Sequence, residues 1–345
     1  MQISKVVPCV RCGTVFLLAV VMVLYLNVGS VYAVDFEKYP QASELVTALT
    51  DQTGLKKERV ESIVREAVFK DDIIKAITRP AEKKFPWYRY RPIFIHDKGI
   101  DLGVEYWNRH EEVLQQAYET YGVNPAIIVA ILGVETRYGK ITGRHRVIDS
   151  LVTIALGYPR RSEFFARQLG EFLELCEEEN LNPLLIKGSY AGAMGIPQFI
   201  SSSYRDFAVD FNDNGQRNLL SETEDAIGSV ANYLAEHNWV KDGQVYAEIQ
   251  GDNVAVLEPI VSKKLKTSGT YGDLKAMDVE LEPSEGLSLD QKLGVIRYEV
   301  EPDKFIFRAG LPNFYAITTY NRSTLYAMAV AELAEQLAQA RSAIN

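Results

Sequence analysis

Residues 124–140 read NPAIIVAILGVETRYGK, and the nine residues after Pro125 carry no polar side chain. Asn124 is a favourable N-cap, Pro125 suits the first helical turn, and Gly139 is a helix stop, so the pattern predicts a helix of about four turns. A helix that is apolar on every side is buried on nearly every side. The chain therefore needs a core that encloses this helix.

Glu135 is the first charged residue of the predicted helix, and it lies three and four residues after Leu132 and Ile131, on their face. Burial disfavours an ionised carboxylate, so we expect the pKa of Glu135 to be raised, as a general acid near neutral pH requires. The alternative is a glutamate that turns outward at the helix end and pairs with Arg137 or Lys140.

The first 33 residues have the pattern of a secretory signal. Lys5 and Arg11 precede an apolar run, and a Val-Tyr-Ala cleavage pattern ends at Ala33. The alternative is an uncleaved anchor, because the uncharged span 12–34 is long enough to cross a bilayer. Cleavage would remove two basic and no acidic side chains, which takes the net charge from −9 to −11.

An acidic mature chain argues against nucleic acid as a partner. Its one remaining cysteine, Cys176, excludes an internal disulfide, so the fold must be held by its core. The histidines show no metal-ligand spacing, which argues against a zinc site; they are His96, His110, His145 and His237.

Apolar spacing of three and four residues predicts a largely helical protein. The predicted helical segments are 36–78, 103–121, 124–140, 151–155, 162–178, 225–237 and 324–340. From 244 to 307 the spacing shortens towards two, as in VYAEI, NVAVL and IRYEVEPDKFIF, which predicts a small β unit with Glu-Pro-Asp as a hairpin turn.

Residues 85–95, FPWYRYRPIFI, are expected to be extended because Pro86 and Pro92 bracket them. Their aromatic side chains are interpreted as a strap across the core, with stacking against sugar rings as the alternative.

Two further segments carry polar groups in unusual settings. Arg160 and Arg161, in GYPRR, lie between predicted helices, where they form a solvated face or bind an anionic or acetylated group. Residues 187–204, KGSYAGAMGIPQFISSSY, are rich in glycine and alanine, with Ser189 and Gln198 as polar groups. Such a segment allows a ligand to approach the backbone closely, and tight packing is the alternative.

Residues 210–218, DFNDNGQRN, resemble a calcium-binding loop. Asp210, Asn212 and Asn214 occupy its first, third and fifth positions, Gly215 the turn at six, and Gln216 the carbonyl position. Serine replaces the glutamate at position twelve, with Glu222, Glu224 and Asp225 just beyond. A metal-free Asx-rich turn is the alternative.

Taken together, these stretches resemble the lytic transglycosylase B family, whose members cut peptidoglycan in the bacterial periplasm. The resemblance rests on ILGVETRYG, GYPRR, KGSYAGAMGIPQF, SSSYRDFAVDFN, DAIGSVANY and LPNFYAITTYNRSTLYAMAV in that order. It implies a mainly α (α+β) protein with a lysozyme-like helical core. Its implied domains are a signal peptide (1–33), a helical N-terminal domain (34–105, completed by 324–345), a catalytic core (106–240, with the loop 210–225), a small β domain (241–309) and a return to the cleft (310–323).

The resemblance identifies Glu135 as the catalytic acid and base. It implies that the substrate-binding residues are Ser189, Gln198, Tyr233, Tyr315, Tyr320, Phe164, Arg160 and Arg161. It assigns calcium to Asp210, Asn212, Asn214, Gln216 and Asp225, in a loop one residue longer than is usual for the family. No cofactor is expected for the chemistry, and calcium would be structural.

The implied reaction cleaves the β-1,4 bond between N-acetylmuramic acid and N-acetylglucosamine and leaves a 1,6-anhydro end. A muramidase that hydrolyses the same bond with water, or a non-catalytic peptidoglycan-binding module, are the alternatives. The expected partners are glycan strands of peptidoglycan and other cell-wall enzymes, and we expect a monomer in the periplasm.

Overall fold

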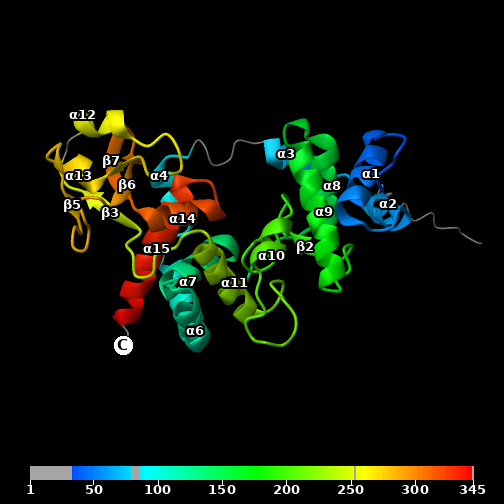
Figure 1. Ribbon diagram of the computed structural model, residues 1–345, viewed down its shortest axis with the longest axis horizontal. Helices are drawn as coiled ribbons and strands as arrows, with labels where there is room; N and C mark the ends of the chain where they lie inside the picture. Colours follow the sequence, from blue (N-terminus) through cyan, green and yellow to red (C-terminus); the bar gives the residue numbers. More distant parts are fainter. Residues whose placement is uncertain (1–32, 79–84, 252–253, 344–345) are drawn as a thin grey trace, which may run out of the picture. The chain divides into compact units, whose positions relative to one another are not determined.

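The computed structural model describes residues 33–78, 85–251 and 254–343 (Figure 1). The predicted signal lies outside these residues except for Ala33. Helices dominate, and one small antiparallel sheet lies late in the chain, which confirms the predicted mainly helical fold class. Within the described residues, no single helix is both long and apolar enough to cross a membrane.

The first helices form a layer on two later ones. They are α1 (Gln41–Thr53), α2 (Lys57–Glu66) and α3 (Asp71–Thr78). The face of α1 that carries Leu45, Val46 and Leu49 is buried, because this helix packs against α9 (Ser162–Glu178), while α3 packs against α8 (Val147–Gly157).

The segment 85–95 is helical, so the expected extended conformation is wrong. It forms α4 (Trp87–Tyr90) and the 3-10 helix η1 (Arg91–Ile93). Both prolines fit this arrangement, because Pro86 precedes the first turn and Pro92 lies in a first turn, where no backbone N–H is needed. Trp87 is buried 5.4 Å from the ring of Tyr298, so the segment is packed on the core as a strap is.

The predicted helix 103–121 is two helices, α5 (Asp97–Arg109) and α6 (Glu111–Tyr121), which is a second correction. The chain leaves the helical conformation at His110, whose φ and ψ are −117° and 25°. The two helices have different partners. Helix α5 packs against α7 (Pro125–Thr136) and α15 (Thr324–Ser342), whereas α6 packs mainly against α11 (Thr223–Glu236).

The apolar helix is α7 (Pro125–Thr136). The side chain of Asn124 accepts a hydrogen bond from the Ala126 N–H at 2.9 Å, as an N-cap does. Every residue from 126 to 132 is at most 5% exposed. The helix ends before the predicted stop at Gly139, because Arg137 and Tyr138 adopt left-handed conformations.

Short elements connect the core helices. They are β1 (His145–Arg146), η2 (Pro159–Arg161), β2 (Lys187–Gly188), α10 (Ser201–Phe207) and α11 (Thr223–Glu236). Strands β1 and β2 pair antiparallel, with His145 opposite Gly188. This pairing places the segment that follows β2 beside the start of α8.

The late sheet has the strand order β4-β6-β7-β3-β5. Its strands are β3 (Tyr246–Ile249), β4 (Gly269–Thr270), β5 (Leu281–Glu282), β6 (Lys292–Glu301) and β7 (Lys304–Gly310). The helical turns within it are α12 (Val254–Leu257), η3 (Glu258–Ile260) and α13 (Tyr271–Lys275). The strand-like spacing of NVAVL was therefore misleading, because four of its residues form α12. A second core made of residues 247–311 lies inside this unit.

The chain ends in α14 (Pro312–Tyr320) and α15 (Thr324–Ser342). Helix α15 packs along α7 and α5, and Figure 1 shows it between α7 and the sheet. The last helix therefore lies against the helix that carries Glu135.

Candidate active site

Glu135 occupies the last turn of α7 and is half-buried. The hydroxyl of Tyr326, in the first turn of α15, donates a hydrogen bond to Glu135 Oε1 at 2.7 Å. Tyr326 is only 2% exposed, and burial followed by the nearby Glu135 charge raises its pKa well above the ordinary value. The tyrosine therefore keeps its proton and acts as a donor that orients the carboxyl group.

Aromatic rings extend from this pair. The ring of Tyr320 stacks on that of Tyr326 at a centroid distance of 6.3 Å, and the ring of Tyr233 meets Tyr320 edge-on at 5.0 Å. Both hydroxyls donate hydrogen bonds to backbone carbonyls. The Tyr320 hydroxyl donates to the Pro197 carbonyl at 2.6 Å, and the Tyr233 hydroxyl donates to the Thr319 carbonyl at 2.9 Å. Two of the predicted cleft tyrosines thus belong to one rigid cluster beside Glu135.

Gln198 lies at the edge of this cluster. Its side-chain nitrogen donates to the carbonyls of Thr142 and Gly195, each at 2.9 Å, and its backbone is left-handed with φ 53°. Together with Tyr233 and Tyr320 it lines a hollow of about 120 Å³. The structure therefore brings this predicted residue to the tyrosines.

Ser189 directly follows β2 and is half-buried. Its Oγ accepts a hydrogen bond from the Ala193 N–H at 3.0 Å, and its backbone pairs with the same residue. The neighbouring Gly188 is needed for packing, since a Cβ there would lie 2.2 Å from the Ala193 carbonyl oxygen. The small residues thus serve close packing of the loop on itself, which leaves the Ser189 hydroxyl as its polar group.

Tyr315 projects from α14 towards the sheet. Its hydroxyl lies 2.1 Å from the point where a Cβ on Gly294 would sit, and Ser262 Oγ lies 2.5 Å from the same point. Burial raises the pKa of Tyr315 to about 12. This predicted cleft residue therefore stands where α14 meets the β unit, five residues before Tyr320.

Arg160, Arg161 and Phe164 lie at the other end of α8. The Arg161 guanidinium covers the ring of Phe164 at 4.3 Å, while Arg160 is exposed. Across the described residues, no hydrogen bond or ring contact joins these three side chains to the tyrosine cluster. They form a separate basic and aromatic surface.

The loop 210–225 is closed by side chains. The amide groups of Asn212 and Asn214 donate to the same oxygen of Glu222, at 2.7 and 2.8 Å. The Asp210 carboxylate accepts the backbone N–H groups of Asn214 and Gly215, at 3.0 and 2.6 Å. The amides of Asn212 and Asn218, and then of Asn214, hold the pKa of Glu222 below its usual value.

Asp225 has a different position in this loop. It is fully buried, and its two oxygens accept the backbone N–H groups of Phe211 and Asn218 at 2.8 and 2.7 Å. Asp210, Asn212, Asn214 and Glu222 nevertheless all carry side-chain oxygens, the ligands that calcium prefers, and hydrogen bonds join the two asparagines to Glu222. The donor set fits calcium, with Glu222 facing the asparagines and Asp225 fastening the loop.

Tyr326 is the site residue that sequence reasoning missed. It lies 191 residues from Glu135. It lies within the stretch LPNFYAITTYNRSTLYAMAV, but the pattern of the closing helix gives this tyrosine no distinguishing signal. Only the packing of α15 on α7 reveals its role.

A half-buried carboxyl group that accepts a hydrogen bond from a buried tyrosine and lies beside further aromatic rings can serve as an acid towards a bound substrate. The family described as "Transglycosylase SLT domain" matches residues 37–335. The chain therefore belongs to this family of lytic transglycosylases.

Individual relatives agree with this assignment. Membrane-bound lytic murein transglycosylase B of Escherichia coli (strain K12) is 38% identical over 316 residues, which cover 89% of this chain and 85% of that protein. Soluble lytic transglycosylase SltB1 from Pseudomonas aeruginosa is 42% identical with a TM-score of 0.81, over 88% of this chain and 100% of that one.

Two solved structures of relatives contain bound groups. Escherichia coli lytic transglycosylase Slt35 in complex with calcium is 38% identical with a TM-score of 0.80, over 91% and 98% of the two chains. SltB3 from Pseudomonas aeruginosa in complex with NAG-anhNAM-pentapeptide is 26% identical with a TM-score of 0.75, over 87% and 79%.

Proposed function

We propose that Glu135 is the single catalytic acid and base of this peptidoglycan lytic transglycosylase. The observation that carries the proposal is the Tyr326–Glu135 hydrogen bond of 2.7 Å at the end of a helix whose residues 126–132 are buried. Glycosidases usually employ two carboxyl groups, but a substrate with an N-acetyl group can supply the second function itself.

The reaction then proceeds within the sugar chain. Glu135 donates its proton to the oxygen between N-acetylmuramic acid and N-acetylglucosamine, the C1–O bond breaks, and the acetamido carbonyl stabilises the cationic C1. The Glu135 carboxylate next removes the proton from the C6 hydroxyl, whose oxygen attacks C1 and closes the 1,6-anhydro ring. The proton returns to Glu135, and no water is consumed.

The surrounding residues position the sugar. Tyr326 orients the carboxyl group, while Tyr320 and Tyr233 form the wall against which the sugar is held. Ser189 and Gln198 contribute polar contacts from the loop opposite. Tyr315 extends the cleft towards the β unit, and the surface of Arg160, Arg161 and Phe164 binds substrate further along the strand.

Replacing Glu135 with Gln tests the assignment. We expect the rate of anhydro-product release from purified peptidoglycan to fall by several orders of magnitude, because the amide can neither donate nor remove the proton. Mass spectrometry of the fragments measures this, since an anhydro end weighs one water less than a reducing end. Glu163→Gln, a change on an exposed part of α9, is the control.

Near-normal turnover by Glu135→Gln would remove Glu135 from the mechanism. Reducing ends from the wild-type protein would show that water rather than the C6 hydroxyl reaches C1, as in a muramidase. Binding of peptidoglycan without any release would support the non-catalytic module.

We also propose a structural calcium ion in the loop 210–225, with Asp210, Asn212, Asn214 and the Gln216 carbonyl as ligands. Glu222 completes the set, and the resemblance adds Asp225, which we assign to fastening the loop. Support comes from the oxygen-bearing side chains that hydrogen bonds gather around Glu222 and from the calcium complex of Slt35. The ion would order the loop and take no part in the chemistry.

A ligand that binds only the folded state raises the free energy of unfolding by about 2.7 kcal/mol at a hundred times its Kd. For a chain of this length, that corresponds to a rise in Tm of about 4 °C. We expect this rise when calcium replaces a chelator. Glu222→Gln should abolish it, whereas Asp225→Asn should lower Tm in chelator as well. Asp213→Asn, at an exposed non-ligand position of the loop, is the control. Equal Tm values in calcium and chelator would contradict the proposal.

We propose that residues 1–33 are an export signal and that the protein acts in the periplasm. The membrane-bound relative supports this location, and anchoring by an uncleaved segment is the alternative. The N-terminal sequence of the protein purified from cells distinguishes them, because cleavage leaves Val34 first. The expected partners remain glycan strands of peptidoglycan and other cell-wall enzymes, and we expect the protein to bind them as a monomer.

A further inference from the structure

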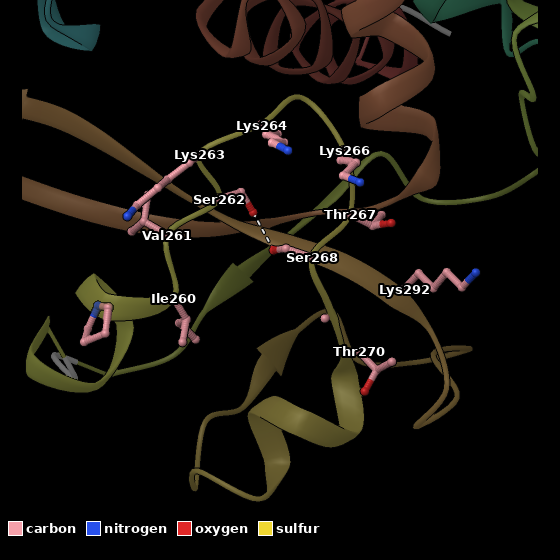
Figure 2. Close-up of a pocket in the computed structure, with 12 residues that line it drawn as sticks. Ile260, Val261, Ser262, Lys263, Lys264, Lys266, Thr267, Ser268, Thr270 and Lys292 are labelled. Atoms are coloured by element: carbon pink, nitrogen blue, oxygen red, sulfur yellow. Dashed lines mark hydrogen bonds between the residues drawn. The ribbon is translucent and has the colours of Figure 1, made fainter.

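A basic hollow of about 730 Å³ lies on the β unit, outside the tyrosine cluster (Figure 2). It is formed by the loop between η3 and β4 together with the start of β6. At its centre Ser262 and Ser268 point towards one another with their hydroxyl oxygens 2.7 Å apart. Lys264 and Lys266 follow the loop beside this pair, and Lys292 lies on the adjoining strand.

The charge of this hollow is unbalanced. Lys263, Lys264, Lys266 and Lys292 all contribute to its lining and all are exposed. In the described part of the chain, none of the four forms an ion pair with a carboxylate. Asp273 borders the hollow, but its carboxylate is engaged in the capping box of Thr270. A protein with net charge −9 thus presents four adjacent unpaired cations beside hydroxyl donors.

The hollow adjoins helix α14, which also carries Tyr320 of the proposed cleft. Ser262, one of its two central hydroxyl residues, lies with Tyr315 around Gly294. Tyr315 and Tyr320 are both on α14, five residues or about 7.5 Å apart along its axis. Tyr320 in turn stacks on the tyrosine that holds Glu135. Helix α14 therefore connects the tyrosine beside the catalytic pair with the loop that carries the lysines.

We propose that this hollow, defined by Ser262, Ser268, Lys264, Lys266 and Lys292, binds the carboxylates of the peptide stem attached to the muramic acid in the cleft. The inference rests on the proposed function, because it needs peptidoglycan in that cleft. Ammonium groups and hydroxyls are donors suited to ionised carboxylates. The relative SltB3 was crystallised with a muropeptide that carries a pentapeptide.

The distances allow this assignment. A stem of five residues spans up to about 17 Å when extended, roughly twice the axial separation of Tyr315 and Tyr320. A stem that leaves the sugar beside Tyr320 is therefore long enough to extend beyond Tyr315 towards the loop that carries the lysines. The stem would serve as a handle that distinguishes peptide-bearing from bare glycan.

The test compares two soluble substrates, uncrosslinked glycan strands that retain their stems and the same strands after an amidase has removed the stems. The variant is Lys264→Ala/Lys266→Ala/Lys292→Ala. We expect its ratio of kcat/KM on stem-bearing to stem-free strands to fall about tenfold relative to wild type, mainly through KM, because three exposed charge pairs together contribute about 1.4 kcal/mol. High salt should reduce the difference.

The matched control is Lys56→Ala/Lys57→Ala/Lys75→Ala, which removes the same charge from exposed positions on and next to the N-terminal helices. It should leave the ratio unchanged. An unchanged ratio in the first variant, with the wild type active, overturns the inference. Absence of anhydro products from wild type on both substrates instead overturns the proposed function. The lysine variant of the hollow could instead lose binding to vesicles containing phosphatidylglycerol while its ratio of kcat/KM values stays unchanged. That result would show that the hollow is a membrane-binding surface and would also overturn the inference.

Discussion

Replacing Tyr326 with Phe isolates the contact that orients Glu135. The change removes one hydroxyl oxygen and leaves a ring of the same shape at a site that is 2% exposed, so packing against Tyr320 is retained. What is lost is a donor 2.7 Å from Glu135 Oε1. The variant should therefore fold normally while its catalytic carboxyl group is held less firmly.

The size of the effect follows from the kind of bond. A hydrogen bond to a charged group contributes about 1.5–3 kcal/mol, which corresponds to a decrease in kcat of roughly 10- to 100-fold. Because the lost donor favours the ionised form of the carboxyl group, the alkaline limb of the pH–activity profile should also move to higher pH. A loss of packing alone would lower stability without moving that limb.

The assay is release of anhydro-ended fragments as a function of pH, with Tm measured in parallel. Tyr298→Phe is the matched control, because Tyr298 is equally buried but donates to the Thr324 carbonyl at 3.0 Å. The control should lose about 1 kcal/mol of stability and keep its activity. A twofold change in kcat corresponds to less than about 0.5 kcal/mol, the effect expected of a substitution at a neutral site. A Tyr326→Phe variant with kcat within about twofold of wild type would therefore refute the reasoning.

Two stability predictions test the scaffold. Arg205 contacts Glu171, Glu174 and Glu178, so Arg205→Met should cost about 2 kcal/mol and lower Tm by about 3 °C. The hydrogen bond from Arg205 keeps the pKa of Glu178 below its ordinary value. The stabilisation is therefore present above the ordinary pKa of glutamate and is lost as the pH falls through the lowered pKa. In thermal melts, the Tm values of wild type and variant should differ at neutral pH and approach one another at acidic pH. Gly143 has φ +107°, and a Cβ there would lie 2.1 Å from the Gly188 backbone, so Gly143→Ala should cost about 2–3 kcal/mol in urea unfolding. Loss of less than about 1 kcal/mol in either variant would contradict these assignments.

Local rules predicted the beginning of α7 better than its end. Asn124 and Pro125 are a cap and a first-turn residue whatever lies around them. The end is set by Tyr138, whose hydroxyl donates to the Gly99 carbonyl at 2.9 Å and whose ring lies where a Cβ on Gly133 would collide with it. Contacts between distant segments therefore turn the chain before Gly139, and periodicity carries no information about them.

The same limit explains the other differences. Prolines around the segment 85–95 indicated an extended chain, but the burial of Trp87 and Tyr90 on one side favours helical spacing. In the calcium loop, sequence offered Glu222 and Asp225 as closing carboxylates. Only the structure separates them, because Asp225 is fully buried on two backbone N–H groups while Glu222 faces the asparagines.

Helix α15 couples the site to the rest of the fold. Six residues after Tyr326, the buried Glu332 pairs with Arg91 of η1 at 2.6 Å and with Arg308 of β7. A buried ion pair contributes little net stability, but removal of one partner leaves uncompensated charge. These pairs therefore fix where α15 lies between the strap and the sheet. Since the same helix carries the donor to Glu135, its register sets the position of the catalytic carboxyl group. Movement of α15 by one residue would turn Tyr326 about 100° away from it.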